Sequence, residues 1–328
     1  MQLTRPVLAD IYQANKRIRE TVQRTPLIKS AWLSDFTGRE IYLKLECLQV
    51  TGSFKIRGAT NKILSLSEDE RNRGVIAVSS GNHGRAVAYV ARQYGLPAVI
   101  CVSETVPENK VTAIQDLGAE VMVTGKTYDE ATETALQVQQ DRGLTMIHPF
   151  DDPDVIAGQG TIGLEIMNQL PDVETVIVPL SGGGLLGGIA LALKSIQPGI
   201  ETIGVSMDKG AAMIDSLNAG RVVEILEEPS LADALIGGLG PENRYTFKIN
   251  QKYVDRTLLV SEHEIAAGMT FALDNEHLVV EGGGAVGIAA LLAEKVTDLG
   301  GKVALVISGS NVKMSTLIGC AQGTYPYQ

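Results

Sequence analysis

The stretch VIAVSSGNHGRAVAYVAR, residues 75–92, has the pattern of a complete strand–turn–helix unit. Residues 75–78 are apolar throughout, residues 79–83 are small and polar, and residues 84–94 follow the spacing of a helix. A short run that is apolar at every position is typical of a strand whose two faces are both covered, as in a parallel sheet between helices. The stretch therefore predicts an α/β fold.

The same unit recurs along the chain. Apolar runs at 98–102, 119–123 and 144–148 precede helical patterns at 108–117, 127–142 and 155–169. Further strand-like runs follow at 175–180, 201–205, 256–260 and 302–307. This rhythm predicts parallel sheets with helices on both faces. Residues 221–256 are the least periodic, and we interpret them as surface excursions.

Composition and charge narrow the classes of function. Lys and Arg number 28 and Asp and Glu 38, a net charge of −10, which disfavours nucleic acid and anionic membranes as partners. The three cysteines are widely spaced, so neither a disulfide framework nor a cysteine-rich metal site is expected. The N-terminal segment has no apolar signal core and no apolar run is long enough to span a membrane. These features predict a cytoplasmic protein that acts on small molecules.

Two polar turns lie between a strand-like run and a helical pattern. Ser79, Ser80, Asn82 and His83 fill the first, where backbone N–H groups at a helix start can hold a carboxylate. Capping of the helix by Ser79 is the alternative interpretation, and the His83 ring is expected to be a packed, hydrogen-bonded group. In the second turn, SGGG at 181–184 can aim N–H groups at a phosphate, or can simply be a tight turn.

Two further glycine-rich segments lie nearer the C-terminus. Residues 308–311, SGSN, follow the last apolar run, where hydroxyl groups at the carboxyl end of a parallel strand can face a ligand crevice, or the segment can simply be a loop of small polar residues. Glu281 directly precedes the glycine-rich start of a helix. The glycine segments lack the lysine of a phosphate-binding P-loop, and Asp208 is the only candidate acid for a dinucleotide fingerprint.

Lys55 is placed unusually, in TGSFKIRGAT at 51–60, after a strand-like run and before a helical one. Phe54 precedes it and a second cation, Arg57, follows two residues later. A lysine in a small-residue turn is either a solvated surface group or a nucleophile. The breaker HPFDDP at 148–153 marks a passage between two lobes, with the ligand in the cleft between them.

Taken in order, S-F-K-x-R-G, S-G-N-H-G, S-G-G-G and S-G-S-N resemble the β-family, or fold type II, of pyridoxal-5′-phosphate enzymes, in the threonine dehydratase and serine racemase branch. The resemblance runs from about Thr25 to Asn311. It implies a two-lobed α/β fold, each lobe a mainly parallel sheet flanked by helices, with the cofactor in the cleft. Residues 1–50 and 153–328 would form the large cofactor-binding domain and residues 51–152 the small one. The family also implies a homodimer or higher homo-oligomer.

The resemblance also implies roles for individual residues. Lys55 would form the Schiff base with pyridoxal 5′-phosphate and later act as the base at Cα, and Ser80 matches the second base of racemases. The remaining cofactor contacts would come from Phe54 against the ring, Asn82 at its hydroxyl, Ser308 at its nitrogen, and Gly182, Gly183, Gly184 and Leu185 at the phosphate. Ser79, Ser80, Asn82 and His83 would bind the amino-acid substrate.

The implied reaction is β-elimination on a β-hydroxy amino acid. The substrate would be serine, threonine, 3-hydroxyaspartate or an amino acid derived from hydroxyectoine, and the products a keto compound and ammonia. A neutral Ser308 at the ring nitrogen weakens the electron sink, which favours loss of a β-leaving group over transamination. Racemisation of the serine racemase type is the alternative. A nicotinamide-dependent oxidoreductase or a non-catalytic binding protein would have no need of Lys55.

Three positions depart from the family pattern. Ser206 stands where an acidic metal ligand is usual, so no metal site is expected. Arg85 replaces the usual glutamine after S-G-N-H-G, either as a solvated residue or as a group that selects an anionic substrate side chain. Gly282 replaces the usual proline after Glu281. The variants SSGNHGRA and VEGGGAVG are most similar to the dehydratases of hydroxyectoine utilisation, and no C-terminal regulatory domain is expected.

Overall fold

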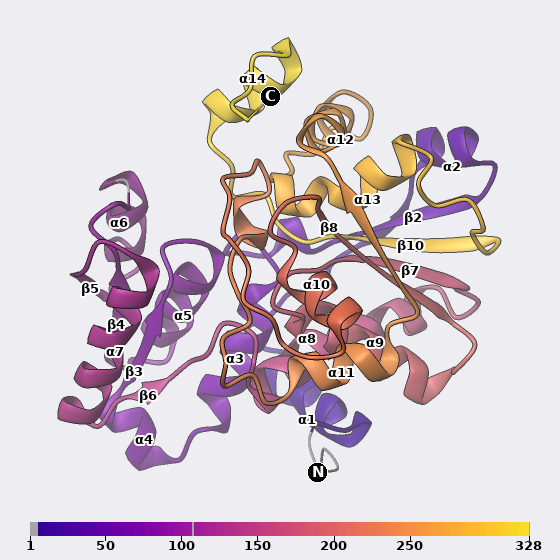
Figure 1. The fold of residues 1–328 in the computed structure, drawn as a ribbon. Coiled ribbons are helices and arrows are strands. Elements are labelled where there is room, and N and C mark those ends of the chain that lie inside the picture. The colour runs from indigo at the N-terminus through magenta and orange to yellow at the C-terminus, as the bar shows by residue number, and fades with distance from the viewer. Residues whose placement is uncertain (1–5, 107, 328) are drawn as a thin grey trace.

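The computed structural model describes residues 6–106 and 108–327, in which ten strands form two sheets (Figure 1). The large sheet has the order β1 (Leu27–Lys29), β2 (Glu40–Leu45), β10 (Lys302–Ile307), β7 (Thr175–Pro179), β8 (Glu201–Met207), β9 (Arg256–Val260). The small sheet has the order β5 (Glu120–Val123), β4 (Ala98–Val102), β3 (Val75–Val78), β6 (Thr145–Met146). Neighbouring strands are parallel, except that β1 runs antiparallel to β2. The expected α/β class with mainly parallel sheets is confirmed.

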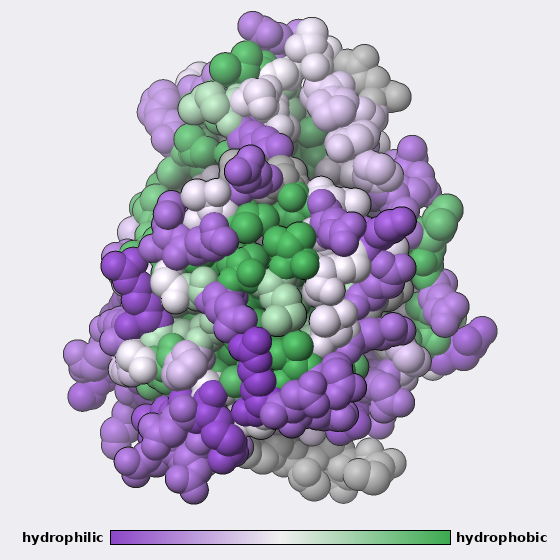
Figure 2. Space-filling view, turned by 90° about the vertical axis from the view of Figure 1, so that its left-hand side faces the viewer, coloured by the Kyte–Doolittle hydropathy of each residue, from purple (hydrophilic) through white to green (hydrophobic). Residues whose placement is uncertain are grey.

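The small sheet and its helices form the lobe on the left of Figure 1, called the small lobe below. Alternate residues of β3 enter different apolar clusters, Val75 and Ala77 on one face and Ile76 and Val78 on the other. This alternation explains why the run is apolar at every position. The helices of this lobe are α4 (Glu68–Arg73), α5 (Asn82–Gln93), α6 (Glu108–Gln115) and α7 (Tyr128–Arg142). On its outer face apolar residues gather in the middle, surrounded by hydrophilic ones (Figure 2).

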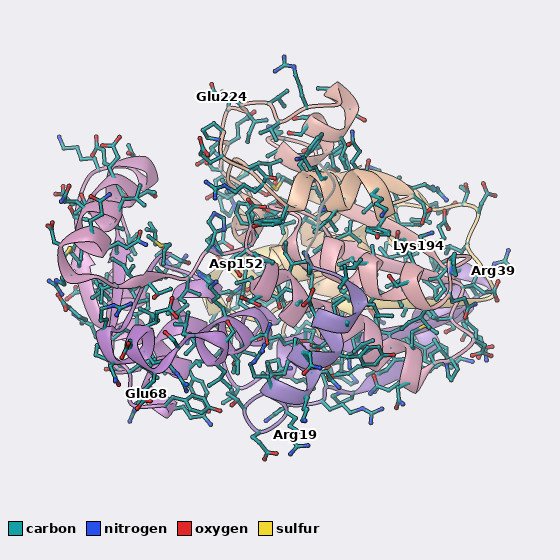
Figure 3. All side chains as sticks on the ribbon, turned by 90° about the horizontal axis from the view of Figure 1, so that it is seen from below. Arg19, Arg39, Glu68, Asp152, Lys194 and Glu224 are labelled. Carbon is teal, nitrogen blue, oxygen red and sulfur yellow. The ribbon has the colours of Figure 1, made fainter. Side chains whose placement is uncertain are left out.

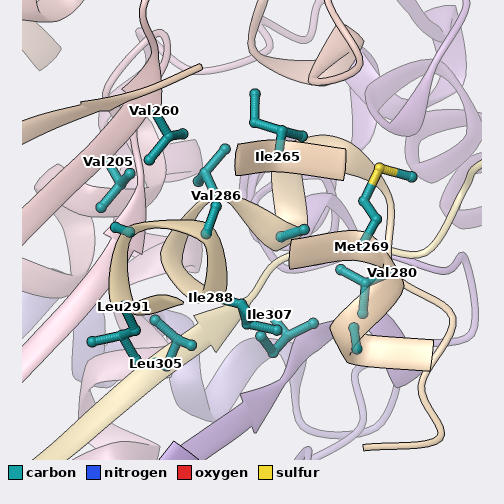
Figure 4. Close-up of a cluster of buried hydrophobic side chains, with 14 of the residues drawn as sticks. Val205, Val260, Ile265, Met269, Val280, Val286, Ile288, Leu291, Leu305 and Ile307 are labelled. Atoms are coloured by element: carbon teal, nitrogen blue, oxygen red, sulfur yellow. The ribbon is translucent and has the colours of Figure 1, made fainter. Parts of the chain in front are cut away.

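The large sheet is also covered on both faces and forms the large lobe. From β10, Leu305 and Ile307 pack against α12 (Glu262–Asp274) and α13 (Gly282–Leu292), whereas Ala304 and Val306 face α8 (Pro153–Gln169) and α9 (Gly184–Ile196). Figure 4 shows side chains of α12, α13 and the strands meeting in the first of these clusters. The described part of the chain also contains α1 (Leu8–Ile18), α2 (Ala31–Thr37), α10 (Ala212–Ala219), α11 (Thr246–Tyr253) and α14 (Met314–Gln322).

Helix α3 (Lys55–Ser65) packs against both lobes, on α8 of the large one and α5 of the small one. Glycine makes the crossing of α3 and α8 possible, because a Cβ at Gly158 would lie 2.7 Å from the Arg57 carbonyl oxygen. Lys55 is the first residue of α3. The packing of α3 therefore places Lys55 between the lobes.

Two segments differ from the sequence-based expectation. The run at 144–148 forms only the two-residue edge strand β6, which pairs with β3 alone. Within residues 221–255, where the sequence shows no period, the structure forms a 3₁₀ turn (Asp233–Leu235) and the helix α11. The first five residues of the N-terminal segment lie outside the described part of the chain. Among the helices that are described, none is long and apolar enough to cross a membrane.

Candidate active site

Lys55 is held in place by the segment before it. Ser53 forms an isolated β-bridge with Gly309, and the Phe54 N–H donates to the Ser308 carbonyl at 3.0 Å. These bonds join the start of α3 to the residues that follow β10, far along the chain. The structure thus brings Lys55 and Ser308 to the same place, at the carboxyl end of the large sheet.

The Lys55 amine lies in surroundings that favour its neutral form. Its Nζ donates to the Pro149 carbonyl oxygen at 2.8 Å and lies 5.3 Å from the centre of the Phe54 ring. Burial lowers the pKa of Lys55 to about 8, and the charge of Glu281 opposes part of that shift. Because the neutral amine is the nucleophile, this shift makes Lys55 more reactive than a solvated lysine.

Asn82 belongs to a hydrogen-bonded group with Glu281 and Asn311. Its Nδ2 donates to Glu281 Oε1 at 2.7 Å, and Asn311 donates from Nδ2 to Asn82 Oδ1 at 2.6 Å and from its backbone N–H to Glu281 Oε2 at 3.0 Å. Glu281 is 4% exposed, and burial raises its pKa to about 7. The sequence showed Glu281 only as the residue before a helix, since its partner Asn82 lies 199 positions away.

The turn at 79–83 does not use Ser79 as a helix cap. Ser79 Oγ accepts from the Gly81 N–H at 3.2 Å, and Gly81 itself is the N-cap of α5. His83 donates from Nε2 to the Ile147 carbonyl at 2.7 Å, and burial lowers its pKa to about 3, so its ring is a neutral structural group. Half-buried Ser80 lies in the same turn, before the N–H groups of the first helical turn, which have no partner within the helix.

The glycine loop before α9 has no room for side chains. Gly183 has a φ of 81°, in the left-handed region that favours glycine. A Cβ at Gly182 would lie 2.4 Å from the Phe150 ring, and one at Gly183 would lie 2.4 Å from Asn250 Nδ2. The first N–H groups of α9, from Gly184 and Leu185, face outward at the positive end of the helix. Such a backbone cradle fits a phosphate.

Arg57 lies at the centre of a buried ionic cluster next to Lys55. Its guanidinium binds both oxygens of Glu46, at 2.7 Å each, and both oxygens of Glu165, at 2.7 and 3.0 Å. Lys44 Nζ donates to Glu165 Oε2 at 2.5 Å, so two cations and two anions balance. The cluster joins α3 to β2 and α8. Arg57 is therefore a buried anchor of the helix that carries Lys55.

The three departures from the family pattern occupy different surroundings. Half-buried Arg85 lines a cavity of about 370 Å³ together with Thr51, Gly52 and Asn311, among other residues. Ser206 is buried, and no group of three or more His, Cys, Asp or Glu that could hold a metal occurs among the described residues. At Gly282 a Cβ would lie 2.1 Å from the Leu231 carbonyl oxygen, which explains the glycine.

Known proteins are similar to this chain in sequence and in fold. A family model described as "Pyridoxal-phosphate dependent enzyme" matches residues 18–309. The L-threonine ammonia-lyase of Thermotoga maritima is 48% identical over 310 residues, which are 94% of this chain and 77% of that protein. The structure of maize serine racemase superposes with a TM-score of 0.91 at 32% identity, covering 97% of each chain. A threonine deaminase structure from T.th. gives a TM-score of 0.87 at 38% identity, covering 94% of this chain and 99% of that one.

Proposed function

Because this chain belongs to the family of pyridoxal-phosphate dependent enzymes, we propose that it is an ammonia-lyase acting on β-hydroxy amino acids. The observation that carries the proposal is the placement of Lys55. Its amine lies between the lobes and has a pKa lowered to about 8. The residue before it, Phe54, donates a backbone hydrogen bond to Ser308. The amine itself donates to the carbonyl oxygen of Pro149, and the next residue, Phe150, lies against the glycine loop.

The residues present fit pyridoxal 5′-phosphate. The N–H groups of Gly182, Gly183, Gly184 and Leu185 would hold the phosphate, in a cradle that a single Cβ would fill. Phe54 would lie against the ring, Asn82 would bond the ring hydroxyl and Ser308 would face the ring nitrogen. When bound, the cofactor supplies an electron sink that makes the Cα proton of an amino acid acidic.

The chain itself would bind the substrate and move a proton. Backbone N–H groups of the turn at Ser79, Ser80, Asn82 and His83 would orient the substrate carboxylate at the start of α5. The neutral Lys55 amine would then accept the Cα proton, and the β-hydroxyl would leave. Hydrolysis of the resulting enamine gives the keto product and ammonia.

We propose that the substrate is serine, threonine, 3-hydroxyaspartate or an amino acid derived from hydroxyectoine. The test is to incubate the holoenzyme with this panel and to measure keto product and ammonia. Release from one or more of them is the expected result, and no release from any would contradict the proposal.

A separate variant, Arg85→Gln, tests whether Arg85 selects substrates with an anionic side chain. If it does, kcat/KM of the variant falls about tenfold or more on 3-hydroxyaspartate and stays unchanged on the other substrates.

Amino-acid racemisation is the second candidate, favoured by the fold shared with maize serine racemase. Ser80 would be the second base, since it lies in the turn that would hold the substrate. Ser80→Ala separates the two reactions. It should abolish any interconversion of L- and D-serine, while ammonia release from the L-amino acid continues.

The proposed organisation follows the two sheets. Residues 51–152 would form the small domain and residues 1–50 and 153–328 the large one, a division supported by the membership of β3–β6 in one sheet and of the other strands in the other. We further propose that the enzyme works in the cytoplasm as a homodimer or higher homo-oligomer, and that neither nucleic acid nor membrane is its partner.

A further inference from the structure

Residues 148–152, called the connector here, run from β6 to α8. Figure 3 shows the labelled Asp152 between the two lobes. Pro149 accepts a hydrogen bond from Lys55, Phe150 lies against the glycine loop, and Asp152 caps α8. Neither the fold nor the proposed reaction accounts for the contacts of Asp151.

The Asp151 carboxylate binds three consecutive backbone N–H groups of a distant segment. It accepts from Arg244 at 2.7 Å, from Tyr245 at 2.9 Å and from Thr246 at 2.8 Å. Thr246 is the first residue of α11, so the anion lies at the positive end of that helix. Charge-assisted bonds of this kind are stronger than neutral ones, and they fix the start of α11 relative to the connector.

One turn further along, α11 contacts the glycine loop. The fully buried Asn250 donates from Nδ2 to the Gly183 carbonyl oxygen at 2.9 Å. On another side of the same loop, the Phe150 ring occupies the space that a Cβ at Gly182 would need. The glycine loop is thus supported by Phe150 directly and by Asp151 through α11 and Asn250.

We propose that Asp151 is a positioning residue for the phosphate cradle, which it supports through α11 without contacting the phosphate. This inference rests on the proposed phosphate contacts of residues 182–185. Loosening α11 would free the Gly183 carbonyl and let the N–H groups of the loop diverge. The variant would then lose affinity for the phosphate group of the cofactor. The bond between the cofactor and Lys55 would be unaffected, because Lys55 belongs to α3.

The test compares two ligands that differ only in the phosphate. Pyridoxal 5′-phosphate and pyridoxal are titrated by absorbance into cofactor-stripped wild type, Asp151→Ala and Asn250→Ala. Both variants should bind pyridoxal 5′-phosphate about tenfold more weakly, the loss expected for about 1.4 kcal/mol, and pyridoxal with unchanged affinity. Asp152→Ala is the matched control, because it removes an aspartate that caps two N–H groups of α8 from the same connector. It should leave the ratio of the two affinities at the wild-type value.

An unchanged ratio in Asp151→Ala, or an equal loss for both ligands, would overturn the inference. If Asp151→Ala fails to fold, Asp151→Asn, which keeps the size of the side chain and removes its charge, takes its place in the same comparison. Gly183→Ala tests the premise separately, because the new Cβ would distort the cradle itself. If Gly183→Ala keeps the phosphate preference, the proposed cradle is wrong; if it loses the preference and Asp151→Ala does not, only the role of Asp151 is wrong.

Discussion

Lys55 combines a position between the lobes with an amine whose pKa is lowered by burial. Lys55→Ala should abolish turnover while leaving the unfolding transition nearly unchanged, because the side chain is half-buried and its amine donates to one carbonyl oxygen. Borohydride reduction of the holoenzyme should attach the cofactor to the peptide containing Lys55, as read by mass spectrometry. Attachment at another lysine would refute the assignment.

Glu281 should make the free energy of unfolding depend on pH. Burial raises its pKa from 4.5 to about 7 in the folded protein, so the fold binds a proton that the unfolded chain releases at a lower pH. The stabilisation from this proton is complete below pH 4.5 and is lost as the pH rises through 7. The total change is about 3–4 kcal/mol, since one pKa unit corresponds to about 1.4 kcal/mol.

Comparison with Glu281→Gln isolates this contribution. In cofactor-free protein, the free energy of unfolding of the wild type should fall relative to that of the variant between pH 4.5 and pH 7, as measured by urea titration. A difference that stays constant over this interval would show that Glu281 does not titrate there.

Among the elements, α3 is held against α8 and the 3₁₀ turn after β2 (Glu46–Leu48) by Arg57 and its two carboxylates. Arg57→Met should lower the free energy of unfolding by about 3–5 kcal/mol, because it leaves the buried Glu46 without its ion-pair partner and Glu165 with Lys44 alone. The control is Arg142→Met, which breaks an ion pair of similar length, 2.8 Å to Glu120, between half-exposed side chains. That change should cost less than about 1 kcal/mol. Equal effects in the two variants would show that burial does not matter here.

Elements with both faces covered were predictable in detail from the sequence. The strands β3, β4 and β10 coincide with the predicted runs, because burial on both faces favours apolar residues at successive positions. The run at 256–260 also coincides with β9, which lies at the edge of the large sheet and is only partly buried. The edge strand β6 is shorter than its run and covers only Thr145 and Met146. In the aperiodic segment, the start of α11 is bonded to Asp151, which lies 93 to 95 positions away.

For the molecule as a whole, the described residues bring no acidic cluster to the position of Ser206. Activity should therefore survive removal of divalent cations by a chelator. The assay is ammonia release before and after dialysis against the chelator, with a buffer exchange as control. A loss that magnesium or calcium reverses would show that another set of residues binds a cation.

Local patterns in the chain were sufficient to predict the fold class and the kinds of chemistry available. Apolar runs predict covered strands, glycine-rich turns predict exposed N–H groups, and the resemblance of the short motifs to a known family implies that Lys55 is a nucleophile. Only the three-dimensional structure shows which of these turns lie next to one another. Three sets of contacts join residues 11 to 199 positions apart. They are the hydrogen bond between Asn82 and Glu281, the ion pairs around Arg57, and the bonds of Asp151 and Asn250 that we propose support the glycine loop. Such contacts arise from helix packing and from the need to pair buried polar groups, and neither of these has a period that a single sequence displays.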